Sequence, residues 1–292
     1  EESEEEEEEE EEEQSKEDGG GHDELSLLAS RLVSHHKRVS LLRHILSFHE
    51  TRNPKDYIKL RSSSKLFHRA LQPPPLWTTF PCSNHATLQS LVDRLEELRG
   101  EEESSGNVPS LLFIEEGEFS SAEGDYIIVN KPLSIYGAGR GKTTLVGVGL
   151  KIYGKKSEGI IEIGDLKIKG GKDAGVFVYE GMNVIVRRCS VENCRHSGVY
   201  VQKVDVSCDD LQVVGCGYSG VCVGSNATIT LSGEGTSIQE NGKENSDDYG
   251  LKTYYSTSKI ILVAPLTKEQ ISSNNGGGGN WGGDGTIEQV CK

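Results

Sequence analysis

The feature that most constrains this fold is a glycine-valine pair that recurs at a nearly constant spacing. It occurs as Gly175-Val176, Gly198-Val199 and Gly220-Val221, and a second valine always follows two positions later, at Val178, Val201 and Val223. The register continues between the pairs, where Val184, Cys189, Val191 and Cys194 return one unit later as Val206, Leu211, Val213 and Cys216. A unit of roughly 22–23 residues is too short to bury its own apolar side, so successive units must stack.

Stacked units of this kind predict a right-handed parallel β-helix solenoid over residues 108–290, mainly β in class, with about eight coils. Leucine-rich repeats share the period, but they need a leucine-dominated pattern and a helix on one side, and neither is present in this segment. One turn is irregular, because Gly250-Leu251 follows Gly220-Val221 after a longer interval than the others. The polar stretch KENSDD accounts for the extra length.

The sequence ahead of the repeats has a different character. Residues 1–21 hold 14 acidic residues, 12 of them glutamates in the first 13 positions, against the single base Lys16. They contribute −13 to the net charge of −15 and predict a disordered acidic tail. Residues 22–100 show helical apolar spacing, as in the run Leu88, Leu91, Val92, Leu95, and predict a small helical region.

Part of that helical region, LLRHILSFHETRNPKDYIKLRSSSKLFHRALQPPPLW, resembles an F-box, the module that docks on the adaptor subunit of cullin-type ubiquitin ligases. It has ILSF at 45–48, a Pro-Lys-Asp turn at 54–56 and Leu76-Trp77 after a proline turn, but it lacks the opening Leu-Pro pair. The resemblance implies an apolar adaptor contact made by Leu42, Ile45, Leu46, Leu60, Leu66, Phe67, Leu76 and Trp77. The alternative is a helical cap that uses the same spacing for internal packing.

Residues 134–147, SIYGAGRGKTTLVG, look like a nucleotide phosphate loop but fail its spacing. That loop needs glycine, four residues and then Gly-Lys-Ser/Thr, and the position of the first glycine is Tyr136. The residues that follow are β-branched or glycine, so no helix N-terminus faces a phosphate. We expect no nucleotide here, but a turn at Gly139 and Gly141, a solvent-facing Lys142 and a strand that includes Thr144.

The segment from 111 to 147 resembles the first coils of β-helix families related to pectate lyases and pectin methylesterases. Enzymes on that scaffold carry a carboxylate cluster on the outer face of one sheet. Two aligned columns supply candidates, Asp165–Arg188–Asp210 and Gly164–Arg187–Asp209, with Asp209 or Asp210 as base or calcium ligand and an arginine to hold a uronate. The alternative is that the alternating charges neutralise one another between coils.

His196 is a further candidate, because Arg195-His196-Ser197-Gly198 resembles the Gly-His-Gly motif of polygalacturonases. That family's Asn-Thr-Asp, Asp-Asp and Arg-Ile-Lys companions do not occur in matching coils, and a solvated corner histidine is the alternative.

The seven cysteines include no CxxC pair, which fits neither a zinc cluster nor a disulfide framework. Cys194 and Cys216 share one interior corner and are expected to stack as small buried side chains. Asn241 and Asn274 are expected at the same corner of later coils, with their amides bonded to corner carbonyls. No cofactor is expected.

Three functions remain open. The leading prediction is a non-enzymatic repeat protein whose β-helix surface recognises a protein partner, with the F-box-like region as its link to a ubiquitin-ligase adaptor; this pairing resembles F-box proteins that carry β-helix repeats. The second is a lyase, hydrolase or esterase of the pectate-lyase type that acts on polysaccharides. The third is a purely structural array.

Charge and hydropathy narrow the choice of partners. Outside the acidic tail the net charge is −2, too little basic character for a nucleic-acid partner. No apolar run is long enough for a membrane span, and the acidic start is unlike a signal peptide. We therefore expect no membrane and an intracellular location, cytoplasmic or nuclear.

Overall fold

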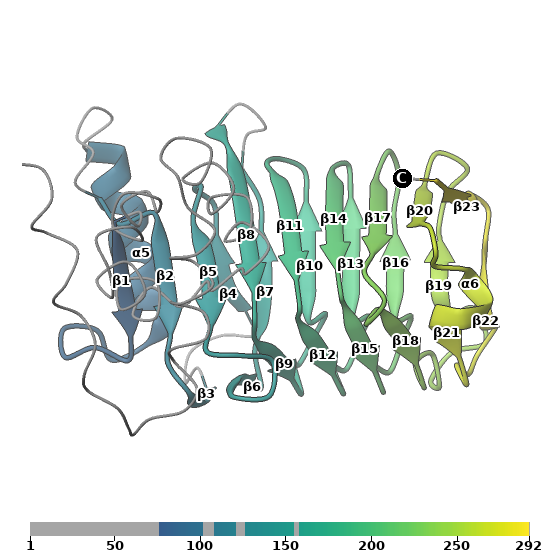
Figure 1. The fold of residues 1–292 in the computed structure, drawn as a ribbon, viewed down its shortest axis with the longest axis horizontal. Coiled ribbons are helices and arrows are strands. Elements are labelled where there is room, and N and C mark those ends of the chain that lie inside the picture. The colour runs from purple at the N-terminus through teal and green to yellow at the C-terminus, as the bar shows by residue number, and fades with distance from the viewer. Residues whose placement is uncertain (1–75, 102–107, 121–125, 155–157, 292) are drawn as a thin grey trace, which may run out of the picture. The chain divides into compact units, whose positions relative to one another are not determined.

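The computed structural model describes residues 76–101, 108–120, 126–154 and 158–291, which form a parallel β-solenoid. Each turn of the chain contributes one strand to each of three sheets in the same order, and the strands stack turn upon turn (Figure 1). The predicted acidic tail and residues 22–75 of the predicted helical region lie outside the described residues. None of the helices described has the length and apolar character required to span a bilayer.

We call the three sheets first, second and third in the order in which the chain enters them. The nine-stranded first sheet contains β1 (Trp77–Phe80), β2 (Leu111–Ile114), β5 (Ser134–Gly137), β8 (Ile160–Gly164), β11 (Asn183–Arg187), β14 (Asp205–Asp209), β17 (Thr228–Ser232), β20 (Lys259–Val263) and β23 (Thr286–Val290). The seven-stranded second sheet contains β3 (Gly117–Ser120), β6 (Thr143–Val146), β9 (Lys167–Lys169), β12 (Ser190–Glu192), β15 (Gln212–Val214), β18 (Ser237–Gln239) and β21 (Ser272–Ser273). The seven-stranded third sheet contains β4 (Tyr126–Val129), β7 (Gly149–Ile152), β10 (Val176–Tyr179), β13 (Val199–Gln202), β16 (Val221–Val223), β19 (Tyr249–Thr253) and β22 (Gly279–Gly283).

The strand register confirms the repeat that the sequence predicts. Val176 pairs with Val199, which pairs with Val221, and Val184 pairs with Val206 in the first sheet. Because the second and third sheets each have seven strands, the described chain makes seven complete turns rather than about eight. The interior is filled by one apolar side chain above another, such as Leu150, Val176 and Val199 at 0% exposure. Burial of each such side chain contributes roughly 1.5–3 kcal/mol to folding.

The repeated glycine is required by space rather than by backbone conformation. A Cβ atom on Gly198 would fall inside van der Waals contact of Val213 Cγ1, which projects into the interior from the second sheet, and a Cβ on Gly175 would meet Val191 in the same way. The third-sheet strand therefore passes too close to the second sheet for any side chain at this position. This close approach explains why glycine precedes the first buried valine in each unit.

The phosphate-loop look-alike is a corner of an early turn, as the sequence predicts. Thr143–Val146 is strand β6 and not the start of a helix, while Lys142 is exposed. Gly139 has φ +147°, a conformation that favours glycine. The hydroxyl of Thr143 is buried and donates to the Glu115 carbonyl at 2.9 Å, so this threonine connects two neighbouring turns of the solenoid.

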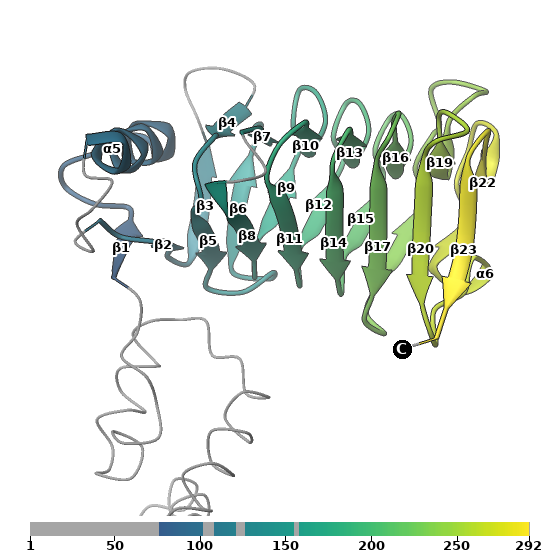
Figure 2. The same ribbon diagram turned by 90° about the horizontal axis from the view of Figure 1, so that it is seen from above.

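The solenoid begins earlier than the boundary at residue 108, which corrects the extent of the helical region. Trp77–Phe80 forms β1 and pairs in parallel with β2, because the aromatic and β-branched residues WTTF complete an otherwise open sheet edge. Only α5 (Leu88–Glu101) is helical in this described part, and it lies at the β1 end of the solenoid (Figure 2). Its Leu88, Leu91 and Leu95 join the solenoid core. The helix is thus a cap that uses its apolar face internally.

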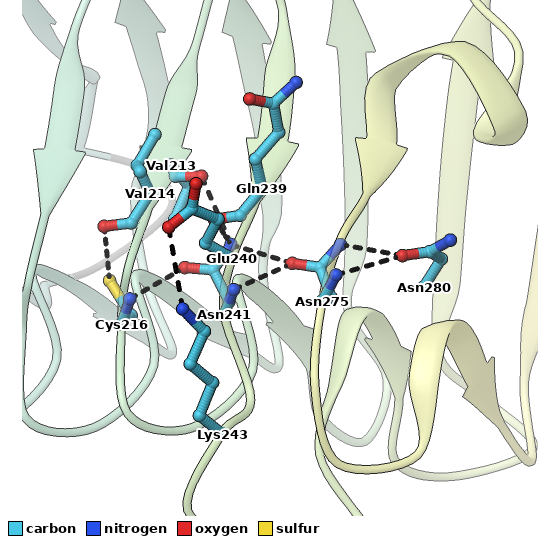
Figure 3. A network of polar contacts seen from close by, with 9 residues as sticks. All are labelled: Val213, Val214, Cys216, Gln239, Glu240, Asn241, Lys243, Asn275 and Asn280. Atoms are coloured by element: carbon cyan, nitrogen blue, oxygen red, sulfur yellow. Dashed lines mark hydrogen bonds and ion pairs between the residues drawn. The ribbon is translucent and has the colours of Figure 1, made fainter.

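A ladder of side-chain amides lies at one corner of the later turns (Figure 3). Asn241 is fully buried; its Oδ1 accepts from the Cys216 backbone N–H at 2.9 Å, and its Nδ2 donates to the Gln239 carbonyl at 2.8 Å. Asn275, not Asn274, continues the ladder by accepting from the Asn241 backbone N–H at 2.9 Å. Asn274 instead takes the preceding corner position, with φ +57°.

The short helix α6 (Lys268–Ile271) lies in the last turn, next to β21. Its N-cap Thr267 forms a capping box with Gln270, and Ile271 is buried in the core.

Candidate functional site: a groove on the third sheet

A groove of about 610 Å³ lies on the outer face of the third sheet, across β7, β10, β13, β16 and β19. This volume is in the range of small-molecule sites. The lining residues are Tyr126, Lys151, Asp173, Ala174, Phe177, His196, Ser197, Tyr200, Tyr218, Cys222, Asn245, Asp247, Asp248, Lys252 and Tyr254. They come from successive turns, so the groove follows the stacking direction.

The floor of the groove is a single column of outward-facing residues, one from each strand. In register order these are Lys151, Phe177, Tyr200, Cys222 and Lys252. The rings of Phe177 and Tyr200 are stacked, with centroids 5.3 Å apart and planes 3° apart, and Lys151 Nζ lies 5.5 Å from the Phe177 centroid. Such parallel and cation–π contacts stabilise the ladder and fix the rings in place.

One wall comes from the corner that precedes each third-sheet strand. Asp173, His196 and Tyr218 stand at this corner in three successive turns. His196 Nδ1 bonds to the Asp173 carboxylate, and the imidazole stacks on Tyr218 with centroids 4.7 Å apart. The carboxylate fixes the imidazole, so that Nε2, for which no partner occurs among the described residues, is available to a ligand.

The other wall comes from the irregular long turn. Asn245, Asp247 and Asp248 belong to the polar stretch that lengthens the interval between Gly220 and Gly250. The stretch begins at Lys243, two residues after Asn241, which the amide ladder holds in the core. Glu244 N–H donates to the Gly217 carbonyl at 3.1 Å and fastens the turn to its neighbour. The insertion is therefore a fixed wall.

Asp248 is the most enclosed carboxylate of the groove, with 4% of the residue exposed. Its Oδ1 accepts from Ser219 Oγ at 2.8 Å and lies 3.3 Å from Lys252 Nζ. Its Oδ2 is buried and has no hydrogen-bond partner among the described residues. A buried carboxylate oxygen without a hydrogen-bond donor lowers the stability of the fold, and this distinguishes Asp248 from the other carboxylates of the groove.

The thiol of Cys222 in the groove floor is not activated as a nucleophile. Burial raises the pKa of the Cys222 thiol to about 12, so it stays protonated at neutral pH. Burial also raises the pKa of the Tyr200 hydroxyl, which keeps it a hydrogen-bond donor. No group of three or more His, Cys, Asp or Glu side chains that could hold a metal ion occurs in the part of the chain that is described.

The arginine and aspartate candidates lie on another face, at the first sheet. Arg187 pairs in register with Gly164 and Asp209, as the alignment predicts. Arg188 binds both carboxylate oxygens of Asp165, at 2.6 and 2.8 Å, and Asp210 Oδ1 accepts from the Gly235 N–H at 2.8 Å. Asp209 accepts from Ser232 at 2.8 Å. These bonds lie between coils, and neither arginine nor either of Asp209 and Asp210 lines the groove.

The candidate adaptor-contact residues are divided by the limits of the described chain. Leu42, Ile45, Leu46, Leu60, Leu66 and Phe67 lie outside it, whereas Leu76 and Trp77 lie within. Leu76 is exposed, but Trp77 starts β1 and packs on the cluster of Leu111, Phe113 and Tyr136. Trp77 therefore takes part in the packing of the first sheet.

Of the sequence candidates that fall within the described residues, only His196 lies in the groove. The floor had a signal in the sequence, since Phe177 and Tyr200 are one repeat apart and each lies between the two buried valines of its unit. Alternation along a strand points these residues outward. The wall formed by Asn245, Asp247 and Asp248 could also be anticipated from the sequence, because these residues lie in the one irregular interval of the described repeat. Nothing local marks Asp173, whose importance depends on His196 one turn later.

Comparisons with known proteins agree with this fold. Residues 148–279 match the family model described as a right handed beta helix region, which includes most of the groove. This part of the chain is accordingly a right-handed parallel β-helix. No curated protein matches the sequence.

Among solved structures, the catalytic domain of a GH87 alpha-1,3-glucanase in complex with tetrasaccharides is similar, with a TM-score of 0.26 and 16% identity. The alignment covers 73% of this chain and 40% of that structure, so the chain spans less than half of its length. A likeness at this level carries no argument about function.

Proposed function

We propose that the chain binds a carbohydrate in the groove of the third sheet. The observation that carries this proposal is the combination of a fixed aromatic floor with polar walls. Phe177 and Tyr200 supply apolar surface, while Asp173, His196 and Asp248 supply donors and acceptors around it. A sugar ring offers C–H groups to the former and hydroxyls to the latter, and few convergent polar groups in a concave aromatic site are typical of ligand recognition.

The position of the groove favours a carbohydrate over an extended peptide. Strands β10, β13, β16 and β19 are each hydrogen-bonded on both sides. A peptide therefore has no free strand edge with which to pair through its backbone. Binding must rely on side chains, and an oligosaccharide laid along the stacking direction can meet one floor residue in each turn.

The experiment is a calorimetric binding screen of the purified chain. The panel contains pentasaccharides of β-1,4-glucan, β-1,3-glucan, α-1,3-glucan, xylan, mannan and galacturonan. At least one is expected to bind, and Phe177→Ala and Tyr200→Ala are each expected to weaken it about tenfold, because a contact ring is lost. Tyr153→Ala is the matched control, since Tyr153 is an exposed tyrosine of the same sheet region that does not line the groove.

No binding by any pentasaccharide, or equal losses in Phe177→Ala and Tyr153→Ala, would overturn the proposal.

Cleavage of the bound carbohydrate is a second candidate, favoured by the Asp173–His196 pair. An imidazole whose Nδ1 is bonded to a carboxylate presents Nε2 as a general base. Release of reducing ends or of unsaturated products from the pentasaccharide that binds tests this candidate. Product that is lost in His196→Ala but retained in Tyr153→Ala supports it, and no product from the wild type contradicts it.

Docking on a ubiquitin-ligase adaptor stays a prediction of the sequence resemblance. Co-purification with the adaptor subunit tests it, with Leu46→Asp as the informative variant. Trp77→Asp does not serve for this purpose, because Trp77 packs against Leu111 and Phe113 in the solenoid and its replacement would lower stability. Association that is absent, or unchanged by Leu46→Asp, would remove the ligase role.

A further inference from the structure

Two exposed tyrosines stand at one end of the groove, at the corner that directly follows β19. Tyr254 lines the groove, and Tyr255 is the next residue along the chain. Their rings meet edge to face, with centroids 4.9 Å apart and planes 64° apart. The two residues are 51% and 46% exposed. Both rings are therefore open to a ligand from solvent, and we call the pair the corner tyrosines.

The backbone of the corner tyrosines is held in place. The Tyr254 N–H donates to the Val223 carbonyl, one turn earlier, at 2.8 Å. The Tyr255 N–H donates to Ser258 Oγ at 3.1 Å, and the Ser258 N–H donates back to the Tyr255 carbonyl at 2.8 Å. Ser258 is 1% exposed, and its hydroxyl donates to the Gly224 carbonyl at 2.8 Å. The exposed rings thus project from a fixed tight turn, so a ligand that packs on them pays little in ordering the protein.

The corner tyrosines continue the aromatic floor of the groove. Gly224 precedes Tyr254 by one turn at the same strand position, because Val223 pairs with Thr253. A Cβ atom on Gly224 would lie 3.2 Å from the Tyr200 hydroxyl, so the Tyr200 side chain extends over this glycine toward the corner. Burial raises the pKa of the Tyr200 hydroxyl, and the phenols of the corner tyrosines raise it further. The aromatic surface therefore passes from Tyr200 to the corner.

The aromatic pair is specific to the turn that contains β19. The strand register gives the residues that occupy the same two positions in the turns of β7, β10, β13 and β16. These are Tyr153-Gly154, Tyr179-Glu180, Gln202-Lys203 and Gly224-Ser225. The same irregular turn that supplies the polar wall thus also supplies two adjacent exposed rings. The repeat does not need them, and their exposure leaves their faces free for a ligand.

The distance from the floor to the corner tyrosines defines the length of the ligand. Strand β19 is three turns away from β10, which carries Phe177. With the usual spacing of parallel strands, three turns correspond to about 14 Å. A trisaccharide is too short to pack one ring on Phe177 and another on the corner tyrosines, whereas an extended pentasaccharide reaches both.

We propose that the corner tyrosines are an end platform of the binding site, on which one sugar ring packs beyond those held on the floor. This inference rests on the proposed carbohydrate-binding function. The C–H groups of the sugar ring contact the aromatic rings, and the tyrosine hydroxyls bond with sugar hydroxyls. The platform makes the groove a site for extended oligosaccharides, with a preference over tri- and disaccharides of the same linkage.

The test measures by calorimetry how affinity depends on chain length, with the tightest-binding pentasaccharide of the panel and the trisaccharide of the same linkage. The wild type should bind the pentasaccharide at least about tenfold more tightly. Tyr255→Ala should weaken pentasaccharide binding about fivefold or more and trisaccharide binding by less than about twofold. Tyr255→Phe keeps the ring and should bind both within about twofold of the wild type. Alanine retains the backbone bonds that hold the turn, so the variant should fold.

Tyr153→Ala is the matched control. Tyr153 occupies the strand position of Tyr254 four turns earlier, is 38% exposed and does not line the groove. Its replacement should leave both affinities within about twofold of the wild type.

Three results would overturn the platform: unchanged pentasaccharide affinity in Tyr255→Ala, equal weakening of both ligands in that variant, or a loss in Tyr255→Phe as large as in Tyr255→Ala. Each of them leaves the proposed function intact if Phe177→Ala still weakens binding. Failure of every pentasaccharide to bind the wild type removes both.

Discussion

The two outer faces of the solenoid use their polar residues in opposite ways. On the first sheet, Arg188 is bonded to Asp165 and Asp209 to Ser232, so these two charged groups have partners one coil away. On the third sheet, Asp248 Oδ2 has no partner among the described residues. A strict repeat places opposite charges in register and neutralises them, whereas a site needs groups that the repeat leaves unpaired.

The difference arises where the repeat is broken. The first-sheet columns come from turns of the regular length, and the long third-sheet turn adds residues that have no counterpart above or below. Asn241 holds the start of this turn in the core, which allows a polar insertion to form a wall. The regular face therefore contributes stability, and the irregular face provides the candidate site.

Replacement of Asn241 by alanine is expected to have the largest effect on stability and on the long turn that forms the groove wall. It leaves the Cys216 N–H and the Gln239 carbonyl without their partner in the core, and the free energy of unfolding should fall by about 3 kcal/mol. Groove binding should weaken with it, as the long turn loses its anchor. Urea denaturation measures the first effect and calorimetry the second. Asn274→Gly is the control and should change both little; an equal loss there would contradict the role of the ladder.

Alkaline pH should destabilise the solenoid through its buried thiols. Burial raises the pKa of Cys189, in the corner between β11 and β12, and of Cys222, in the groove floor, to about 12 each. Because the thiol pKa is higher in the folded chain than in the unfolded chain, the thiol's full contribution to the free energy of unfolding is present below the unfolded-chain pKa near 8.5. That contribution is lost as the pH rises toward 12. At pH 10 the loss is about 2 kcal/mol per thiol.

Urea denaturation at pH 7, 9 and 10 measures this loss of stability. Cys189→Ala should have a shallower decline between pH 9 and 10 than the wild type, although it is less stable at pH 7. Cys291→Ala serves as the control, because Cys291 is exposed. A decline that Cys189→Ala leaves unchanged would show that the thiols do not cause it.

Removal of the Asp165–Arg188 ion pair is expected to have the smallest effect. The two side chains retain 20% and 28% exposure, so Arg188→Ala should lower the free energy of unfolding by less than about 1 kcal/mol. Ligand binding should not change, since neither residue lines the groove. Thermal melts and calorimetry check the two results. A loss of binding in Arg188→Ala would restore the first-sheet face as a functional site.

The sequence predicts the β-helix well because its signals are local and repeated. Val176, Val199 and Val221 give the period, and the same residues pair in the sheet. The site is harder to predict, because it depends on residues that meet only across turns. Asp173 matters through His196, and Asp248 through Ser219 and Lys252. Trp77 is ambiguous for another reason, because its aromatic character suits an adaptor contact and a strand equally well.

Hydrogen exchange of the wild-type chain, with and without the tightest-binding pentasaccharide, tests most directly which face binds a ligand. The groove on the third sheet predicts slower exchange in residues 173–179, 196–202 and 243–254, with no change in residues 162–165, 185–188 and 205–210. Protection confined to the first-sheet segments would contradict the assignment of the site to the groove.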